Sequence, residues 1–383
     1  MRKRVVILGS TGSIGRGCLD VLAHLSAEWE VVGLAAGSRW ADVSEQAQRF
    51  SVSSIAVTNG ACPEDLKSAF PKSARLFLGP DAMVQLLDEV PCDCVVAAVV
   101  GAKGLSATLR AVELGRRVAL ANKEALVIAG SLLIPLAKRT GATIIPVDSE
   151  HSAVFQALHA GKRSEVRTVY LTASGGPFRT WTDDEMDDIR LEDALRHPTW
   201  SMGPKITIDS ATMMNKALEI VEARWLFGLA PEQIKVVVHP ESIIHSLVEF
   251  RDGSMIAQLG TPDMRTPIQY ALTYPDRRAC PSQALDLFSL RCLTLHPPDV
   301  ERFPALRLGY EVAARGGTSG AVLNGANEAA VELFQQGTIH YREIAKSVER
   351  VLSVHECVES PTLQELLAAD QWARHEVTRC LVC

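Results

Sequence analysis

The sequence lacks a long apolar run, an excess of positive charge and any sign of disorder. Its longest apolar stretch, Cys94 to Ala102, is far shorter than the roughly 20 residues of a membrane-spanning helix. A net charge of −6 and a pI near 6.0 give no support for binding to nucleic acid or to an anionic membrane. With 47% hydrophobic and 22% charged residues, the chain has the composition of a folded protein. We therefore expect no nucleic-acid partner and no membrane partner.

The cysteines lack the paired spacing of a disulfide framework. There are nine, an odd number, and they are scattered along the chain. Cys380 and Cys383 form a C-x-x-C pair with no second pair nearby to complete a zinc site. The basic residues 1–4 run directly into an apolar strand and a glycine turn, which leaves no room for a signal peptide. These features predict a cytoplasmic protein with free thiols.

The pattern of apolar runs predicts an α/β protein with three domains. Residues 1–148 alternate short β-branched runs with helical patterns, which indicates an N-terminal Rossmann-like parallel sheet that binds a nucleotide. Residues 149–275 mix strands and helices, as expected of a central α+β catalytic domain. Proline and glycine mark 276–304 as a linker, and 305–383 carry almost only helical pattern, which predicts a C-terminal helical domain. The expected strands are Val5–Leu8, Val31–Ala36, Ser54–Val57, Val95–Val99, Arg117–Leu120, Thr143–Pro146, Val166–Thr172, Lys235–Val238, Ser246–Phe250 and Met255–Leu259; the clearest helical patterns are Gly15–Leu25, Trp40–Phe50 and Ala211–Phe227.

A glycine-rich turn follows the first predicted strand. Gly9, Gly12 and Gly15 give the spacing G-x-x-G-x-x-G, a variant of the dinucleotide fingerprint. Glycine lets the backbone turn sharply and lets a pyrophosphate approach the N-terminus of the following helix. A bare structural turn is the alternative, but the strand-turn-helix context favours a nucleotide site.

The end of the second predicted strand favours NADPH over NADH. Enzymes that use NAD place an acid there to hold the ribose 2′-hydroxyl, whereas an arginine accommodates a 2′-phosphate. This chain has Gly37, Ser38 and Arg39 and no acid at that point. The alternative is that Arg39 is an ordinary surface charge.

Two acids follow the strand Thr143–Pro146. If that strand continues, Asp148 and Glu150 lie at positions i and i+2 and point to one face. Converging carboxylates repel each other unless a cation or a proton lies between them, and a hard divalent metal is the natural occupant. The alternative is two solvated acids in a surface loop.

Four further segments carry polar residues that suit a ligand site, and each has an ordinary structural explanation as well. Ala121–Glu124 lies at the carboxyl edge of the sheet, where open α/β folds bind ligands. Ser174–Pro177 suits an anion, and His197–Pro204 has the composition of a loop that closes over a ligand. Asp209–Glu219 opens a predicted helix whose N-terminus attracts phosphate.

Within this last segment, Asn215 and Glu219 are four residues apart and share a helix face, while Ser210 and Lys216 lie near the N-terminal end.

Taken in order, these segments resemble the 1-deoxy-D-xylulose 5-phosphate reductoisomerase family over roughly residues 4 to 332. The stretches that carry the resemblance are Gly9–Gly15, Ala121–Glu124, Pro146–Ser152, Ala173–Phe178, His197–Gly203, Asp209–Glu219 and Leu323–Glu328.

The resemblance implies a role for each of these residues. The expected ligands of Mg²⁺ or Mn²⁺ are Asp148, Glu150 and Glu219. The residues expected at the carbonyl and hydroxyl end of the substrate are Lys123, Ser149, Glu150, His197 and Glu219, of which Lys123, Glu150, His197 and Glu219 are the catalytic candidates. The expected phosphate contacts are Ser174, Ser210, Asn215 and Lys216. The expected NADPH contacts are Thr11, Gly12, Ser13, Ile14, Gly37, Ser38, Arg39, Asn122, Glu124 and Gly203, and the expected lid carries Trp200 and Met202.

The reaction implied is the rearrangement of 1-deoxy-D-xylulose 5-phosphate and its reduction by NADPH to 2-C-methyl-D-erythritol 4-phosphate, a step of non-mevalonate isoprenoid synthesis. The resemblance also implies a homodimer. Two alternatives stay open: another NADP-dependent oxidoreductase, such as a semialdehyde dehydrogenase with a nucleophilic cysteine, or a catalytically silent NADP-sensing protein.

Two positions depart from the family pattern. Gly37-Ser38-Arg39 stands where many members have Gly-Lys-Asn, which leaves the contact with the 2′-phosphate open. Ala217 replaces a common glycine inside a helix, a change that favours the helix.

Overall fold

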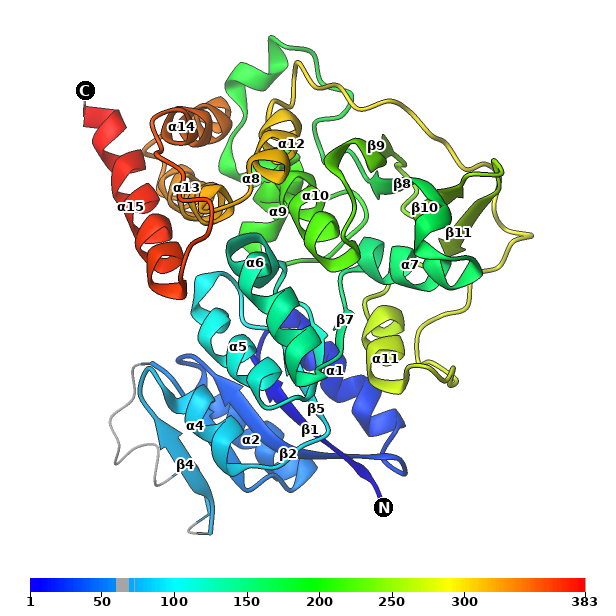
Figure 1. Ribbon diagram of the computed structural model, residues 1–383, viewed down its shortest axis with the longest axis vertical. Helices are drawn as coiled ribbons and strands as arrows, with labels where there is room; N and C mark the ends of the chain where they lie inside the picture. Colours follow the sequence, from blue (N-terminus) through cyan, green and yellow to red (C-terminus); the bar gives the residue numbers. More distant parts are fainter. Residues whose placement is uncertain (60–68, 72, 383) are drawn as a thin grey trace. The chain divides into compact units, whose positions relative to one another are not determined.

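A computed structural model describes residues 1–59, 69–71 and 73–382, and it divides into two compact units (Figure 1). The N-terminal unit comprises residues 1–125, 133–152 and 263–283. The C-terminal unit comprises residues 126–132, 153–262 and 284–383.

The N-terminal unit is built on a seven-stranded parallel sheet with the order β4-β3-β2-β1-β5-β6-β7. Its strands are β1 (Lys3–Leu8), β2 (Trp29–Ala36), β3 (Ser54–Val57), β4 (Arg75–Leu78), β5 (Cys94–Ala97), β6 (Arg117–Leu120) and β7 (Ile144–Pro146). The central strands β1 and β5 carry continuous apolar runs because both faces of a parallel sheet are covered.

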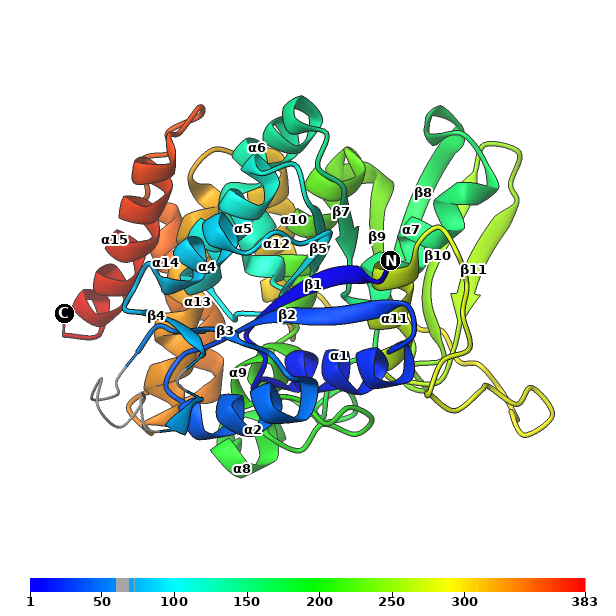
Figure 2. The same ribbon diagram turned by 90° about the horizontal axis from the view of Figure 1, so that it is seen from below.

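Helices cover both faces of this sheet, with α1 and α2 on one side and α4 and α5 on the other (Figure 2). The helices are α1 (Ser13–His24), α2 (Trp40–Phe50), α4 (Ala82–Glu89), α5 (Leu105–Glu113), α6 (Lys123–Thr140, apart from residues 126–132) and α11 (Arg265–Thr273). Strands β2 to β4 lie in order on one side of β1, and β5 to β7 lie on the other. The order therefore reverses between β1 and β5, the point at which open α/β sheets bind ligands.

The C-terminal unit combines a mixed four-stranded sheet, in the order β11-β10-β8-β9, with a set of helices. The strands are β8 (Val166–Ala173), β9 (Ile234–Val238), β10 (Ile244–Phe250) and β11 (Met255–Leu259). The helices are α7 (Ser149–Ala157, from residue 153 onward), α8 (Leu191–Ala194), α9 (Pro204–Ala211), α10 (Met214–Phe227), α12 (Ala305–Arg315), α13 (Ser319–Gln335), α14 (Tyr341–Ser353) and α15 (Leu363–Val382).

The buried helix α10 lies at the centre of the helical part and packs against α12. Gly309 of α12 is in such close contact that a Cβ there would lie 2.6 Å from the Cα of Ala217. The small residue at 309 thus makes room for the alanine that replaces the family's common glycine.

The predicted fold class is confirmed, and all ten predicted strands are present with small shifts at their ends. One strand, β4, was not predicted. The predicted helix from Ala211 to Phe227 is wrong at its start, because Met213 has φ +60° and separates α9 from α10. The four functional divisions of the chain remain a prediction; α11, placed by sequence in the catalytic domain, belongs to the N-terminal unit.

No helix that the structure describes has the length and apolar character needed to cross a membrane. The seven cysteines at described positions are free thiols, and Cys62 and Cys383 lie outside the described residues.

Candidate active site

The glycine turn after β1 is closely packed against neighbouring backbone. Gly9 has φ +84°, and a Cβ there would lie 2.5 Å from the Ala98 carbonyl oxygen; a Cβ on Gly15 would lie 2.3 Å from the Gly9 oxygen. Both glycines are therefore required by the turn itself. Gly12 differs, because the nearest atom to its Cβ position is 3.4 Å away.

Gly12 is also the N-cap of α1, which has no side-chain cap and no acid in its first turn. The predicted contacts Thr11 to Ile14 thus surround an uncapped helix N-terminus, a favourable place for an anion. Arg16, which the sequence analysis did not single out, steadies this turn by donating from Nε to the Thr11 carbonyl oxygen at 3.1 Å. Its position directly after Gly15 is a signal that could have found it.

The residues predicted to meet the 2′-phosphate lie at the carboxyl end of β2, next to β1 in the sheet. Gly37 has no atom within 4 Å of its Cβ position. The Arg39 side chain is 55% exposed, and its guanidinium lies 4.0 Å from the Asp42 carboxylate. Arg39 is thus an accessible cation at the end of β2.

Asn122, Lys123 and Glu124 form the start of α6 after β6. The Asn122 side chain caps the helix by accepting from the Ala125 amide at 3.2 Å and donates to the Gly101 oxygen at 3.1 Å. The buried Lys123 forms an ion pair with Asp148. These two residues follow the neighbouring strands β6 and β7, so the carboxyl edge of the sheet brings them together.

The acids Asp148 and Glu150 do not lie on one strand, so the alternation argument was wrong in its geometry. Strand β7 ends at Pro146, and Glu150 lies in the first turn of α7. Ser149 donates its hydroxyl to the Glu150 carboxylate at 2.7 Å. The fully buried His151, which the sequence analysis passed over, has its Nδ1 3.8 Å from Asp148 Oδ2.

In the C-terminal unit, Ser174 of the loop after β8 contacts a second predicted site residue, His197. Ser174 Oγ lies 2.9 Å from His197 Nε2. His197 Nδ1 accepts hydrogen bonds from the Thr199 and Trp200 amides at 3.1 and 2.9 Å. Because Nδ1 accepts, the proton of the neutral ring is on Nε2, and the imidazole donates to Ser174.

The loop from His197 to Gly203 therefore begins at a fixed histidine. Trp200 packs near His245, with ring centroids 6.2 Å apart, and Met202 is half-buried. Gly203 precedes Pro204, the first residue of α9.

The predicted phosphate residues lie on both sides of the break at Met213. Ser210 is in the last turn of α9, so the dipole argument was wrong for it. Lys216, the other residue of that argument, does lie in the first turn of α10, as does Asn215. The loop after β8 comes close to Ser210, since a Cβ on Gly176 would lie 2.8 Å from the Ser210 oxygen.

Glu219 is fully buried, and its two oxygens are held by the two residues expected to bind phosphate. Asn215 Nδ2 donates to Oε1 at 2.6 Å, and the ammonium of Lys216 pairs with Oε2. A buried carboxylate needs such partners to offset its desolvation. The helical spacing of Asn215 and Glu219 was predicted correctly.

Three family models match the chain and together cover most of it. The model of 1-deoxy-D-xylulose 5-phosphate reductoisomerase matches residues 5–130, and two models of its C-terminal domain match residues 144–227 and 259–376.

Relatives with the name 1-deoxy-D-xylulose 5-phosphate reductoisomerase match over almost their whole length. The protein from Pelotomaculum thermopropionicum is 48% identical, with 97% of each chain covered, and that from Symbiobacterium thermophilum is 48% identical, with 98% of this chain and 97% of the relative covered.

Solved structures agree with these matches. The reductoisomerase from Zymomonas mobilis in complex with NADPH is 42% identical with a TM-score of 0.93, covering 100% of this chain and 99% of that one. A DOX-P reductoisomerase in complex with NADPH, fosmidomycin and magnesium is 38% identical with a TM-score of 0.93, covering 99% and 98%. The chain belongs to the 1-deoxy-D-xylulose 5-phosphate reductoisomerase family of enzymes.

Proposed function

We propose that the chain performs the reaction of its family with the residues predicted from its sequence. It converts 1-deoxy-D-xylulose 5-phosphate to 2-C-methyl-D-erythritol 4-phosphate, with NADPH as reductant and Mg²⁺ or Mn²⁺ as the metal. One observation carries the residue assignment: the expected metal ligand Glu219 is bracketed by the expected phosphate contacts Asn215 and Lys216.

NADPH supplies the hydride, and the N-terminal unit supplies its binding site. The uncapped N-terminus of α1 takes the pyrophosphate at Thr11, Gly12, Ser13 and Ile14. Arg39, with Gly37 and Ser38, takes the 2′-phosphate. Asn122, Glu124 and Gly203 complete the cofactor contacts.

Three carboxylates, Asp148, Glu150 and Glu219, hold the divalent metal. Their oxygens are the hard ligands that Mg²⁺ and Mn²⁺ prefer, and the buried setting of Glu219 suits a charged ligand with a cationic partner. When bound, the metal supplies Lewis-acid stabilisation of charge that develops on adjacent substrate oxygens.

The protein's own groups orient the substrate around that charge. Lys123 and Ser149 lie beside the acids and hold the carbonyl and hydroxyl end of the substrate. His197 holds its proton on Nε2 and can donate it as a hydrogen bond to a substrate oxygen in place of Ser174. Ser174, Ser210, Asn215 and Lys216 bind the phosphate, and Trp200 and Met202 belong to a lid that excludes water.

The test is an assay of NADPH oxidation with the pentulose phosphate and Mn²⁺, with the product identified by mass. We expect turnover that stops in excess chelator. No turnover by correctly folded, metal-loaded protein would contradict the proposed reaction and favour a silent NADP-sensing protein. A nucleophilic role for Cys94 is disfavoured, because burial raises the pKa of its thiol to about 12.

The chain acts as a homodimer. Strand β11 is an edge strand whose Met255, Ile256 and Leu259 are exposed, and Leu287 and Phe288 add further exposed apolar surface in the same unit. An exposed apolar edge strand is a template for pairing with a second chain. Light scattering should give the mass of a dimer, and Ile256→Asp should shift it toward the monomer; a monomeric wild type would contradict this.

The cytosol is the proposed compartment, supported by the free thiols at all seven described cysteines. Cell fractionation tests it. Functionally, we divide the chain into cofactor-binding residues 1–148, catalytic residues 149–275, a linker at 276–304 and a helical domain at 305–383.

A further inference from the structure

The motif Leu323-Asn324-Gly325-Ala326-Asn327-Glu328 on α13 has no role in the chemistry described so far. Asn324 and Asn327 are fully buried, which is unusual for amide side chains unless they are hydrogen-bonded. They lie three residues apart on one helix, yet they bind different acids. The motif therefore joins two separate parts of the C-terminal unit.

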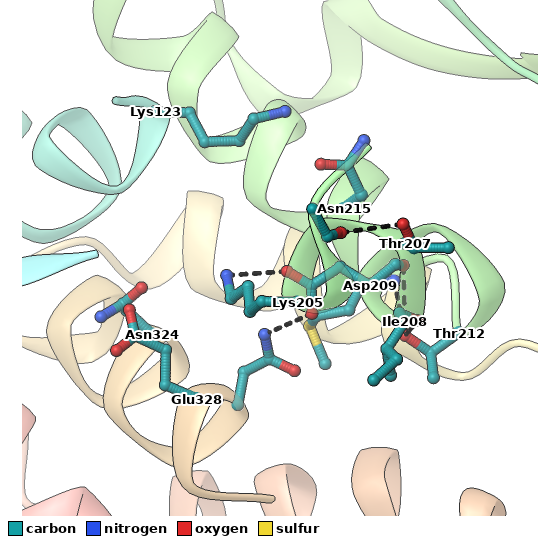
Figure 3. Close-up of polar contacts among 12 residues, drawn as sticks. Lys123, Lys205, Thr207, Ile208, Asp209, Thr212, Asn215, Asn324 and Glu328 are labelled. Atoms are coloured by element: carbon teal, nitrogen blue, oxygen red, sulfur yellow. Dashed lines mark hydrogen bonds and ion pairs between the residues drawn. The ribbon is translucent and has the colours of Figure 1, made fainter. Parts of the chain in front are cut away.

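Asn327 binds the acid that directly precedes Ser210. Its Nδ2 donates to Asp209 Oδ1 at 2.8 Å. Lys205 Nζ lies 2.7 Å from Asp209 Oδ2 (Figure 3). Asp209 is only 1% exposed. A buried aspartate costs desolvation free energy that an apolar residue would not, so stability alone gives little reason for an acid at this position.

Asn324 binds on the α15 side of the same helix. Its Nδ2 donates to Asp370 at 2.8 Å, and Arg374 binds both Asp370 and Glu328 at 2.7 Å. Burial opposes the charge of Arg374, but the hydrogen bond that Arg374 donates to Asp370 and the nearby Glu328 outweigh it and raise the pKa of the guanidinium. This cluster ties α13 to α15.

Two other contacts hold the chain beside Ser210. The buried Tyr341 of α14 donates its hydroxyl to the Ala211 oxygen at 2.6 Å, and Gly176 lies against the Ser210 backbone. The segment Asp209–Met213 is therefore fixed at Asp209 by α13 and at Ala211 by α14. Both anchors come from the C-terminal helices.

We propose that Asp209 and Asn327 are positioning residues that hold the Ser210 segment in its phosphate-binding conformation. The inference rests on the proposed function, because it assumes that Ser210 contacts the substrate phosphate. Through the α13 motif, the C-terminal helices would then contribute to substrate binding.

An exchange of the two groups tests the contact. Asn327→Asp places two carboxylates at hydrogen-bond distance, and we expect the KM for the pentulose phosphate to rise on the order of tenfold or more. The KM for NADPH should stay unchanged. Asp209→Asn combined with Asn327→Asp restores one amide and one carboxylate, and it should bring the substrate KM back to within about threefold of wild type. The inhibition constant of inorganic phosphate, used as a competitive inhibitor, should rise in Asn327→Asp and recover in the double variant.

Asn324→Asp is the matched control. Asn324 lies on α13, as Asn327 does, but the change places its carboxylate against Asp370 of α15. It should lower the melting temperature without raising the substrate KM. Should Asn327→Asp fail to fold, the conservative variant Asp209→Asn provides the same comparison of the two KM values.

Equal increases of the substrate KM in Asn324→Asp and Asn327→Asp, or no recovery in the double variant, would overturn the inference. An unchanged KM in every variant of an active enzyme would also overturn it. Absence of turnover in the wild type would instead contradict the proposed function.

Discussion

The cofactor region and the substrate region are built in opposite ways. The turn from Gly9 to Gly15 is shaped by its backbone, since a Cβ added to Gly9 or Gly15 would lie only 2.3 to 2.5 Å from a backbone oxygen. The segment from Asp209 to Glu219 depends on side chains instead. The buried Asp209 binds Lys205 and Asn327, and the buried Glu219 binds Asn215 and Lys216. Added atoms should thus weaken ligand binding in the cofactor region, and changed charges should weaken it in the substrate region.

The difference follows from what each ligand group needs. A pyrophosphate can be bound by the amides of a helix N-terminus, which every residue provides. A divalent metal and a sugar phosphate need carboxylates, ammonium groups and hydroxyls at fixed positions. Burial of such groups requires partners for each, and those partners come from distant parts of the chain.

The largest effect should come from Glu219→Gln. The change keeps the size of the side chain but removes one carboxylate of the metal site, and we expect kcat to fall on the order of 10³-fold or more. NADPH affinity, measured by fluorescence titration, should stay near the wild-type value. A variant that turns over normally with metal bound would exclude Glu219 as a ligand.

Because the variant also leaves Lys216 without its carboxylate partner, its melting temperature is the necessary control.

Gly12→Ala should instead weaken the binding of NADPH and leave the metal site intact. Its backbone conformation, φ −72° and ψ 173°, is open to alanine, and the added Cβ has room at 3.4 Å, so the protein should fold. The methyl group occupies the place where the pyrophosphate approaches α1, and the Kd for NADPH should rise about tenfold or more. Metal-dependent binding of fosmidomycin in the absence of NADPH should not change. Unaltered NADPH affinity would show that the cofactor does not use this turn.

A smaller effect is expected from Arg39→Asp, which should move preference from NADPH toward NADH. A carboxylate repels the 2′-phosphate and can accept a hydrogen bond from a free 2′-hydroxyl. The ratio of kcat/KM for the two cofactors should change about tenfold. Arg49→Asp, at the other end of α2 and equally exposed, is the matched control. If both variants leave the ratio unmoved, Arg39 is a bystander and Ser38 is the next candidate.

Local patterns predicted six of the seven strands of the N-terminal unit. The strands carry short apolar runs, the turn carries its glycines in sequence, and the parallel sheet then brings Lys123 and Asp148 together at one edge. The short strand β4 was missed because its Arg75–Leu78 run has little to distinguish it from a loop. The convergence of the acids was expected from strand pleat, yet a helix begins at Ser149.

The substrate region was predictable only through resemblance. No local pattern predicts that Met213 adopts φ +60° and divides the helix. None predicts that Asn327 binds an acid 118 residues away. His151 was passed over because a lone histidine beside acids has no distinctive spacing; its complete burial becomes visible only in the structure. Long-range pairs of this kind depend on tertiary packing rather than on propensity.

The most direct test is calorimetric titration of fosmidomycin, a phosphonate with a hydroxamate, into the wild type with Mn²⁺ and in excess chelator. The hydroxamate oxygens should take the chelating positions on a metal held by Asp148, Glu150 and Glu219. We predict tight binding with Mn²⁺, loss of most of that affinity in chelator, and a change in fluorescence on binding that Trp200→Phe removes. Equal affinity with and without the metal would contradict the three-carboxylate site.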